Sequence, residues 1–402
     1  MEITRQVLVT SLLSLIGSSL LSYFLVLFFK RLALKTGIVD KPRGDRFHQE
    51  PVPLMGGNAI YLTFLIFLVV RDLIEVWFGL AMLAGVVFLL YGIIRKPGRM
   101  FLFFGLAVAW CSLWGLAATD GVGDQILGLL VGGTILMMVG NVDDARGGII
   151  PYIKVLGQTI AGFFLIYCGI KVNFFVDLGY DLGFQWIKWL SSPFTLFWII
   201  GMTNAFNLID NMNGLSCGVA VISSFFFGLI SFVNGQVPLG TIFFIFMGAG
   251  IGYLPHNFPR AKIFMGDTGS LFIGFVIAGL SIVGSWSTAA GWTSGPLKLS
   301  LAIPLLVLIY PIFDTVLVMV TRFMRGRPIS LGGKDHSSHR LVRLGLQPVD
   351  TVLLIYTFSS FAGFCALFLT IIGYEQALLM LAFLFLFIFL VGLRLGKIAV
   401  DG

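Results

Sequence analysis

The feature that most constrains this chain is a succession of long apolar runs along nearly its whole length. A helix that crosses a bilayer needs roughly 20 mostly apolar residues, because it must span a hydrocarbon core of about 30 Å. Such runs lie near residues 7–29, 52–70, 76–94, 101–118, 125–141, 155–170, 193–208, 215–233, 239–254, 269–286, 300–320, 351–372 and 376–393. The mean hydropathy of +0.98 also exceeds what a soluble domain of this size needs. We therefore predict an all-α, polytopic transmembrane helical bundle with about 11–13 spans.

No internal repeat, low-complexity segment or long polar insertion divides the sequence, so we expect a single membrane domain over residues 1–402. Within it, residues 71–118 look like an extra helical hairpin with a short basic turn. The first apolar run lacks the small-residue cleavage site of a signal peptide and should remain as a helix. All four cysteines fall inside apolar runs, which argues against a disulfide framework or a zinc cluster.

Charge predicts the orientation of the bundle. If the N-terminus is external, one side carries all of the 26 Lys and Arg residues except Arg5, Arg71, Lys171, Lys188 and Lys298. By the positive-inside rule that side is cytoplasmic. We expect a multi-pass protein of the bacterial cytoplasmic (inner) membrane, whose partners include the lipid bilayer and no nucleic acid. The net charge of +7 is then mainly a matter of topology.

Unusual polar residues gather on the same predicted side. They form clusters at Arg46 and His48, at Asp143, Asp144 and Lys154, at Asn204, Asn207, Asp210 and Asn213, at Asn257 and Asp267, and at His336, His339 and Arg340. The external loops hold nothing comparable. A solvated loop or a helix cap explains an acidic pair equally well, and His336 with His339 could form half of a metal site. The clustering nevertheless predicts a cytoplasmic active site.

Two groups within the apolar runs are harder to explain as solvated surface. Asn204, Asn207 and Asp210 are spaced by three, so on a helix they share one face within about 120°. Helix-packing contacts are the alternative explanation. Asp314 lies eight residues before Arg322, about 12 Å along a helix. An acid at that depth must face the protein interior, pair, or stay protonated.

The string Asp267-Thr-Gly-Ser occurs around the catalytic carboxylate of aspartic proteases. A soluble protease needs this string on a β-loop, whereas here it opens an apolar helix. An intramembrane protease using Asp267 and Asp314 is an alternative, but it leaves the other clusters without a role. Acids mixed with basic residues instead suit a site that holds a divalent metal and an anionic phosphate.

Six ordered segments carry a family resemblance: DKPRGDRFHQEPVPLMGG (40–57), GNVDDARGGIIPYIKVLGQ (140–158), NAFNLIDNMNGLSCG (204–218), NFPRAKIFMGDTGSLFIGF (257–275), IPLLVLIYPIFDTV (303–316) and GGKDHSSHRLVRLGL (332–346). They resemble the polyprenyl-phosphate N-acetylhexosamine-1-phosphate transferases. The resemblance is closest to the undecaprenyl-phosphate N-acetylglucosamine-1-phosphate branch, which starts O-antigen or teichoic acid synthesis. It implies transfer of a sugar 1-phosphate from a UDP-N-acetylhexosamine to undecaprenyl or another polyprenyl phosphate, with release of UMP.

The resemblance also implies roles for individual residues. Asp267, Asp143 and Asp144 would hold Mg²⁺, with Mn²⁺ as a substitute, and Asp210, His336, His339 and Arg340 would complete the catalytic set. Phe264 would stack on uracil beside Asn257. Further substrate-binding residues by position are Arg46, His48, Lys154, Asn204, Asn207, Asn213 and Asp314. A homodimer is a further expectation.

The match is not complete. Asn213 stands where the family often has a second acid, and its amide brings no negative charge to a metal. Asn211 stands where glycine is common. The last loop lacks the histidine triplet of the muramyl-pentapeptide translocase, which favours a small donor such as UDP-N-acetylglucosamine. We prefer direct attack by the lipid phosphate; an aspartyl-phosphate intermediate is the alternative.

Two other functions make different predictions. A secondary transporter would place its polar groups near the midplane, often with an inverted repeat. A flippase for the lipid-linked product would need a continuous polar path, and the external half of the spans offers almost no charge.

Overall fold

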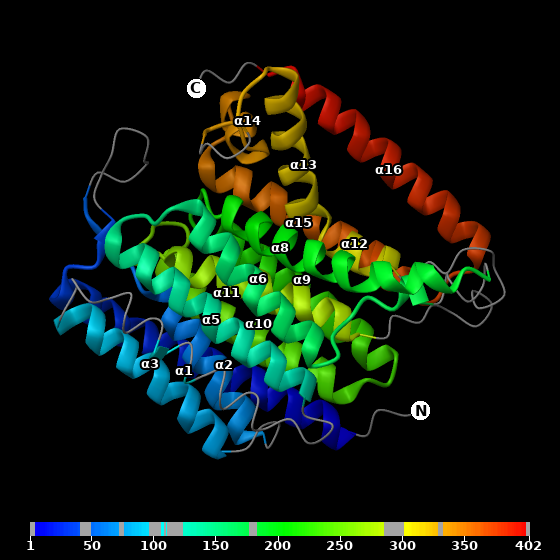
Figure 1. Cartoon of the computed structure of the whole chain (residues 1–402). Coiled ribbons are helices and arrows are strands. Elements are labelled where there is room, and N and C mark those ends of the chain that lie inside the picture. Colours follow the sequence, from blue (N-terminus) through cyan, green and yellow to red (C-terminus); the bar gives the residue numbers. More distant parts are fainter. Residues whose placement is uncertain are drawn as a thin grey trace.

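The computed structural model describes residues 5–40, 50–71, 76–95, 106–107, 110, 124–176, 183–284, 301–328 and 333–398. Its described part is almost entirely helical (Figure 1). The helices are α1 (Arg5–Thr36), α2 (Gly56–Val70), α3 (Val76–Arg95), α5 (Asp124–Arg146), α6 (Pro151–Tyr167), η2 (Gln185–Leu190), α8 (Ser191–Leu208), α9 (Leu215–Val233), α10 (Val237–Asn257), α11 (Gly266–Val283), α12 (Ala302–Val307), α13 (Ile309–Met324), α14 (Ser337–Arg343), α15 (Pro348–Phe368) and α16 (Tyr374–Gly396).

Helices occupy every expected apolar run except 101–118, most of which lies outside the described residues. Of the helices in the described ranges, seven are long and apolar enough to cross a membrane alone: α1, α5, α9, α10, α11, α15 and α16. The prediction of an all-α polytopic membrane protein is confirmed.

The centre of the bundle is formed by α5, α9, α10 and α11. In α5, 89% of the residues in the most apolar 18-residue stretch are buried inside the protein, against 11% in α16. Figure 1 shows α16 at the edge of the molecule, apart from the central helices. Helices such as α16 expose Leu and Phe side chains all round, as expected where lipid is the solvent.

The run at 300–320 is not one continuous helix as expected. It breaks at Leu308, between α12 and α13. Pro311 has no backbone N–H, so it cannot bond the carbonyl of Val307 four residues earlier. That carbonyl instead accepts a hydrogen bond of 3.3 Å from Ser223 Oγ on α9. The proline thus explains the break, and α9 satisfies the carbonyl that it frees.

Two short strands close the loop after α1. Strand β1 (Val39–Asp40) pairs antiparallel with β2 (Val52–Pro53), with Val39 opposite Pro53. Arg46 and His48 belong to the segment between these strands and lie outside the described residues. Their predicted roles remain predictions.

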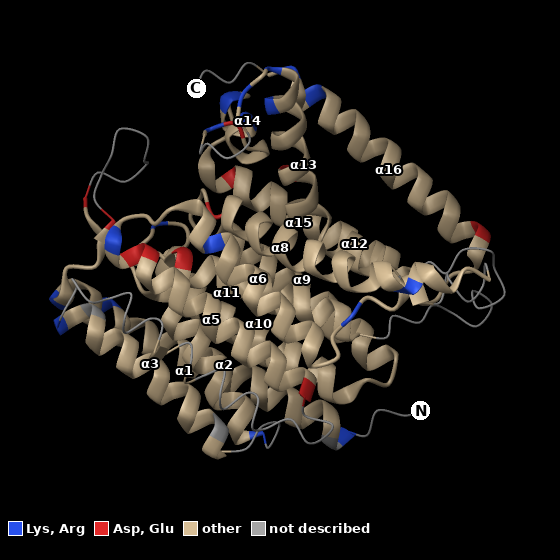
Figure 2. Ribbon diagram, viewed as in Figure 1, with Lys and Arg blue, Asp and Glu red and all other residues tan. Residues whose placement is uncertain are grey.

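Most charged residues of the described ranges lie at or near the ends of the helices, with Asp314 inside α13 as an exception. Figure 2 shows the central helices almost free of Lys, Arg, Asp and Glu, with most of the charge near α14 and at the end of the bundle where α5 finishes. The first half of the proposed 71–118 hairpin is the helix α3, and Trp110 Nε1 donates a hydrogen bond of 3.0 Å to the carbonyl of Ala81 on it. The hairpin as a whole remains a prediction.

Candidate active site

The site begins where α11 meets the end of α5. The first N–H groups of a helix have no partner within it and favour a negative charge. Asp144, from α5, supplies one: Oδ1 accepts from Asp267 N at 2.9 Å, and Oδ2 accepts from Thr268 N at 3.2 Å and Thr268 Oγ1 at 2.6 Å. A carboxylate from one helix therefore caps another.

Two glycines allow this contact. A Cβ on Gly140 would lie 2.3 Å from Thr268 Cα, so only glycine lets α5 approach α11 this closely. Gly266 has a φ of +70°, in the left-handed region that favours glycine, and a Cβ there would lie 2.3 Å from Asp144 Oδ2. Both glycines fall in the segments that carry the family resemblance.

Asp143 and Asp267 face a shared lysine. Lys154 Nζ, on α6, lies 3.1 Å from Asp143 Oδ1 and also forms an ion pair with Asp267 Oδ2. Asp143 Oδ1 accepts a further hydrogen bond of 2.7 Å from Ile149 N, which ties the loop between α5 and α6 to the cluster. The lysine compensates part of the charge that three neighbouring acids bring together.

The three carboxylates satisfy the chemistry of a divalent metal site. Asp143, Asp144 and Asp267 each offer an oxygen, and these atoms all lie within 4.8 Å of one another. Hard cations such as Mg²⁺ prefer carboxylate oxygens. The donor set predicted from the sequence is thus brought together, although the hydrogen bonds of Asp144 give it a structural role as well.

The loop before Asp267 is fastened to the segment that leads into α2. Phe264 N donates to Pro53 O at 2.9 Å, Gly56 N to Phe264 O at 3.0 Å, and Gly57 N to Met265 O at 3.0 Å. Phe264 is partly exposed. Its backbone is therefore fixed, and its predicted contact with uracil remains a prediction.

The polar face predicted for α8, formed by Asn204, Asn207 and Asp210, is shorter than expected. Helix α8 ends at Leu208, so Asp210 lies in the following turn, exposed, and does not continue the helical face of Asn204 and Asn207. Asn204 exchanges hydrogen bonds of 2.9 and 3.2 Å with Gln158 on α6, and Asn207 Nδ2 donates to Ser270 Oγ at 2.8 Å. Both asparagines join helices in the described structure.

Gln158 was not predicted as a site residue, although it lies four residues after Lys154 and therefore on the same face of α6.

Asn257 was predicted beside uracil. The structure uses its side chain internally: Oδ1 accepts from Gly214 N at 2.6 Å, and Nδ2 donates to Ile263 O at 2.9 Å. Asn213 Nδ2 donates to Pro259 O at 3.2 Å. These two asparagines tie the α8–α9 turn to the loop that precedes α11.

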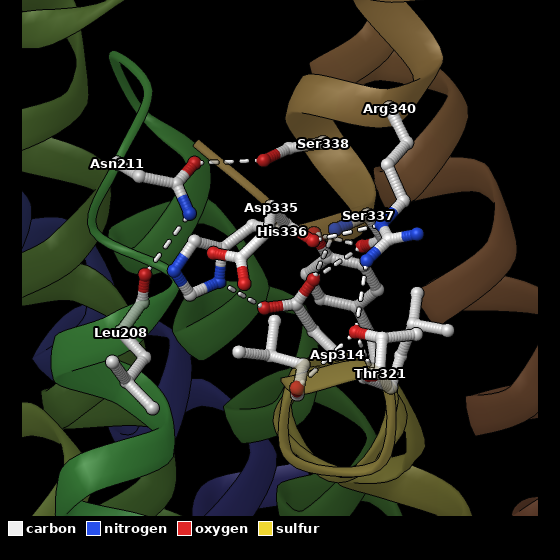
Figure 3. Close-up of polar contacts among 12 residues, drawn as sticks. Leu208, Asn211, Asp314, Thr321, Asp335, His336, Ser337, Ser338 and Arg340 are labelled. Atoms are coloured by element: carbon white, nitrogen blue, oxygen red, sulfur yellow. Dashed lines mark hydrogen bonds and ion pairs between the residues drawn. The ribbon is translucent and has the colours of Figure 1, made fainter. Parts of the chain in front are cut away.

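The residues from Asp335 to Arg340, which include His336 and His339 and are called the histidine segment below, form a separate unit built on α13 and α14 (Figure 3). Arg322 binds Asp335 through two contacts of 2.6 Å, Nε to Oδ2 and Nη2 to Oδ1. Burial alone would raise the pKa of Asp335, but the hydrogen bonds and charge of Arg322 outweigh it and lower that pKa. Burial, followed by the positive charges of His336 and Lys334, lowers the pKa of His339 to about 4. His339 is therefore neutral near pH 7.

Arg340 was predicted to meet the diphosphate, but the structure places it inside the protein. It is 0% exposed. Its Nε donates to Asp335 O, Nη1 to Leu395 O and Nη2 to Thr321 Oγ1, at 2.8 to 2.9 Å. All three nitrogens are thus engaged, and Arg340 holds α14 against α13 and α16. The sequence gives no indication of this burial.

The protease hypothesis paired Asp267 with Asp314, and these two acids have different partners in the structure. Asp314 is buried and bonded to His336 and Ser337, whereas Asp267 is bonded to Lys154 on another part of the bundle. The Asp267-Thr-Gly-Ser string opens α11, as expected. Clustered carboxylates with a lysine at one end of a helical bundle instead suit a site that holds a divalent cation and an anionic phosphate, as a membrane-embedded phosphoryl transferase needs.

Comparison with known proteins agrees with this class. Residues 126–285 match the model described as glycosyl transferase family 4. A probable undecaprenyl-phosphate N-acetylglucosaminyl 1-phosphate transferase of Bacillus subtilis is 30% identical over 331 residues, which cover 81% of this chain and 76% of that protein. A decaprenyl-phosphate N-acetylglucosaminephosphotransferase of Mycobacterium tuberculosis is 30% identical over 370 residues, covering 88% and 81%. The chain belongs to glycosyl transferase family 4.

Proposed function

We propose that this protein transfers N-acetylglucosamine 1-phosphate from UDP-N-acetylglucosamine to undecaprenyl phosphate or a similar polyprenyl phosphate, releasing UMP. The observation that carries the proposal is the Asp143–Asp144–Asp267 cluster with Lys154 beside it. The names of the relatives support the acceptor class and the sugar phosphate. The product would be the lipid-linked sugar that starts a cell-envelope polysaccharide.

The cluster fits Mg²⁺, with Mn²⁺ as a substitute. Asp143 and Asp267 would be the main ligands, because both oxygens of Asp144 already bond the first residues of α11. Bound there, a divalent cation supplies the positive charge that allows carboxylates and an anionic phosphate to share one site. Lys154 contributes a further positive charge beside the same oxygens.

The acceptor needs little activation by a base. A phosphate monoester has its second pKa near about 6, so the lipid phosphate is mostly a dianion at neutral pH. We infer that one of its oxygens attacks the sugar-bearing phosphorus directly. The new P–O bond forms as the bond to UMP breaks, and UMP leaves. The residues of the site then act chiefly by alignment and charge neutralisation.

The same proposal places the site at the cytoplasmic face of the inner membrane. The predicted cytoplasmic loops carry most of the Lys and Arg residues, and the acidic cluster lies at the same ends of the helices. A homodimer remains a prediction.

UMP release tests the proposal. Purified protein in detergent is mixed with undecaprenyl phosphate and a panel of UDP-sugars, with and without Mg²⁺, and Asp267→Asn serves as the blank. We expect metal-dependent UMP from UDP-N-acetylglucosamine and none from the blank. If no donor gives UMP, although a known transferase accepts the same lipid sample, the proposal fails and transport or flipping becomes the better hypothesis.

A further inference from the structure

Asp314 is the most deeply buried acid near the histidine segment, with an exposed fraction of 0%. Both of its oxygens are engaged. Oδ2 lies 2.7 Å from His336 Nδ1, and Oδ1 accepts from Ser337 N at 2.6 Å and Ser337 Oγ at 2.5 Å (Figure 3). Oδ1 is an acceptor in both of its bonds, because a backbone N–H can only donate.

This contact decides which nitrogen of the ring carries a proton. A carboxylate oxygen accepts hydrogen bonds, so the donor opposite Asp314 Oδ2 is Nδ1 of His336. Nε2 is then the atom left for another partner: it accepts when the ring is neutral and donates when the ring is charged. Figure 3 shows that Nε2 points away from Asp314, toward the turn between α8 and α9 that carries Asn211.

Hydrogen bonds of Asn211 fix the turn between α8 and α9, which faces the ring of His336. Ser338 Oγ donates to Asn211 Oδ1 at 2.8 Å, and Asn211 Nδ2 donates to Leu208 O at 2.9 Å. The contact between Asp314 and His336 thus anchors α14 to α13. The bond between Ser338 and Asn211 anchors α14 to the α8–α9 turn. In turn, Asn207 connects α8 to Ser270, one helical turn after Asp267.

We propose that Asp314 is a positioning residue for His336: with Ser337, it fixes the ring so that Nε2 is the atom presented to the anionic diphosphate of the donor. This inference rests on the proposed function. It assigns Asp314 no direct contact with substrate, in contrast to the substrate-binding role implied by the family resemblance, because both carboxylate oxygens are already bonded.

Replacing Asp314 by Asn isolates this role, because the two side chains have the same shape. Ser337 offers two donors to the Oδ1 position, so the amide oxygen must occupy that position. The amide nitrogen then faces His336 Nδ1 as a donor, and the ring proton must move to Nε2. A matched control lies next to it on the same helix: the buried Thr315 Oγ1 has no hydrogen-bond partner, so Thr315→Val removes no bond.

The first measurement is the protonation of the ring. The chain has four histidines, so protein labelled with ¹⁵N-histidine gives few ring signals, and His336→Gln identifies the signal of His336. We expect protonated Nδ1 in the wild type and Thr315→Val, and protonated Nε2 in Asp314→Asn. An unchanged ring signal in Asp314→Asn would overturn the proposal. This readout does not depend on activity, so it stands even if the wild type releases no UMP and the proposed function fails.

The second measurement is UMP release. We expect Asp314→Asn to lower kcat by about 100-fold, the order of effect seen when one aligned donor is lost, with Thr315→Val close to wild type. Ser337→Ala keeps Asp314 facing Nδ1 and should lower kcat less than about tenfold. If Ser337→Ala loses as much activity as Asp314→Asn while keeping protonated Nδ1, the loss reflects weakened docking of α14, and the proposal is wrong. It is equally wrong if the ring proton moves and kcat does not change.

Discussion

Asp144→Asn should separate the two roles that Asp144 plays. The sequence predicts a metal ligand, whereas the structure shows a carboxylate that caps α11. Oδ2 accepts from both Thr268 N and Thr268 Oγ1. In Asn, one of the two oxygens becomes an NH₂ group. If that group takes the Oδ2 position, donors face donors; if it takes the Oδ1 position, Asp267 N loses its acceptor.

The cost follows from these bonds. A buried donor left without an acceptor costs about 1–3 kcal/mol. We therefore expect Asp144→Asn to lower the free energy of unfolding by about 2 kcal/mol in the absence of metal. The assay is reversible unfolding in mixed detergent, followed by Trp fluorescence, with chelator present.

Asp143→Asn is the matched control, since Asp143 is predicted as a ligand but does not cap α11. It retains an oxygen for Ile149 N and should change the metal-free stability less than Asp144→Asn does. Both variants should raise the Mg²⁺ concentration needed for half-maximal UMP release, Asp143→Asn more strongly. If Asp144→Asn unfolds like the wild type without metal, the capping argument is refuted.

Three further predictions concern packing and charge. Gly140→Ala should separate α5 from α11 and abolish most UMP release, because its Cβ would lie 2.3 Å from Thr268 Cα; normal activity would contradict that close approach. Asp335→Ala should destabilise the protein by about 3–5 kcal/mol, because it removes both contacts of 2.6 Å that Asp335 makes with the buried guanidinium of Arg322. Limited proteolysis around α14 measures the effect. The pKa of His339 is lowered to about 4 in the folded protein. Between about pH 6.5 and 4 the unfolded state therefore binds more protons than the folded state. The free energy of unfolding should fall by about 3 kcal/mol in all as the pH drops through this range. His339→Gln should flatten that slope in a pH series of unfolding curves.

The sequence predicted the helices well because lipid imposes a simple rule on length and polarity. It failed at the 300–320 run, where Pro311 and the hydroxyl of Ser223 decide the break, and at Asp210, where the chain leaves the helix at Leu208. Short-range patterns cannot reveal that a residue on another helix satisfies a freed carbonyl.

The candidate site was predictable as a set of residues more than as a set of roles. The sequence brings Asp143, Asp144 and Asp267 to one end of the bundle, and the structure confirms that they are close. Which acid caps a helix, and which arginine is buried, depends on partners far away in the chain. Arg340, for example, bonds Leu395, 55 residues later.

The cap on α11 also bears on how the protein is made. Asp144 and the helix that it caps are 123 residues apart in sequence, so the ribosome completes α5 long before it reaches α11. Until α11 enters the membrane, Asp143 and Asp144 stand without Asp267, and the metal-binding set is incomplete. The predicted metal-binding set therefore becomes complete only at the step that inserts α11. A nascent chain that stalls earlier would carry the acidic pair but could not consume the lipid carrier.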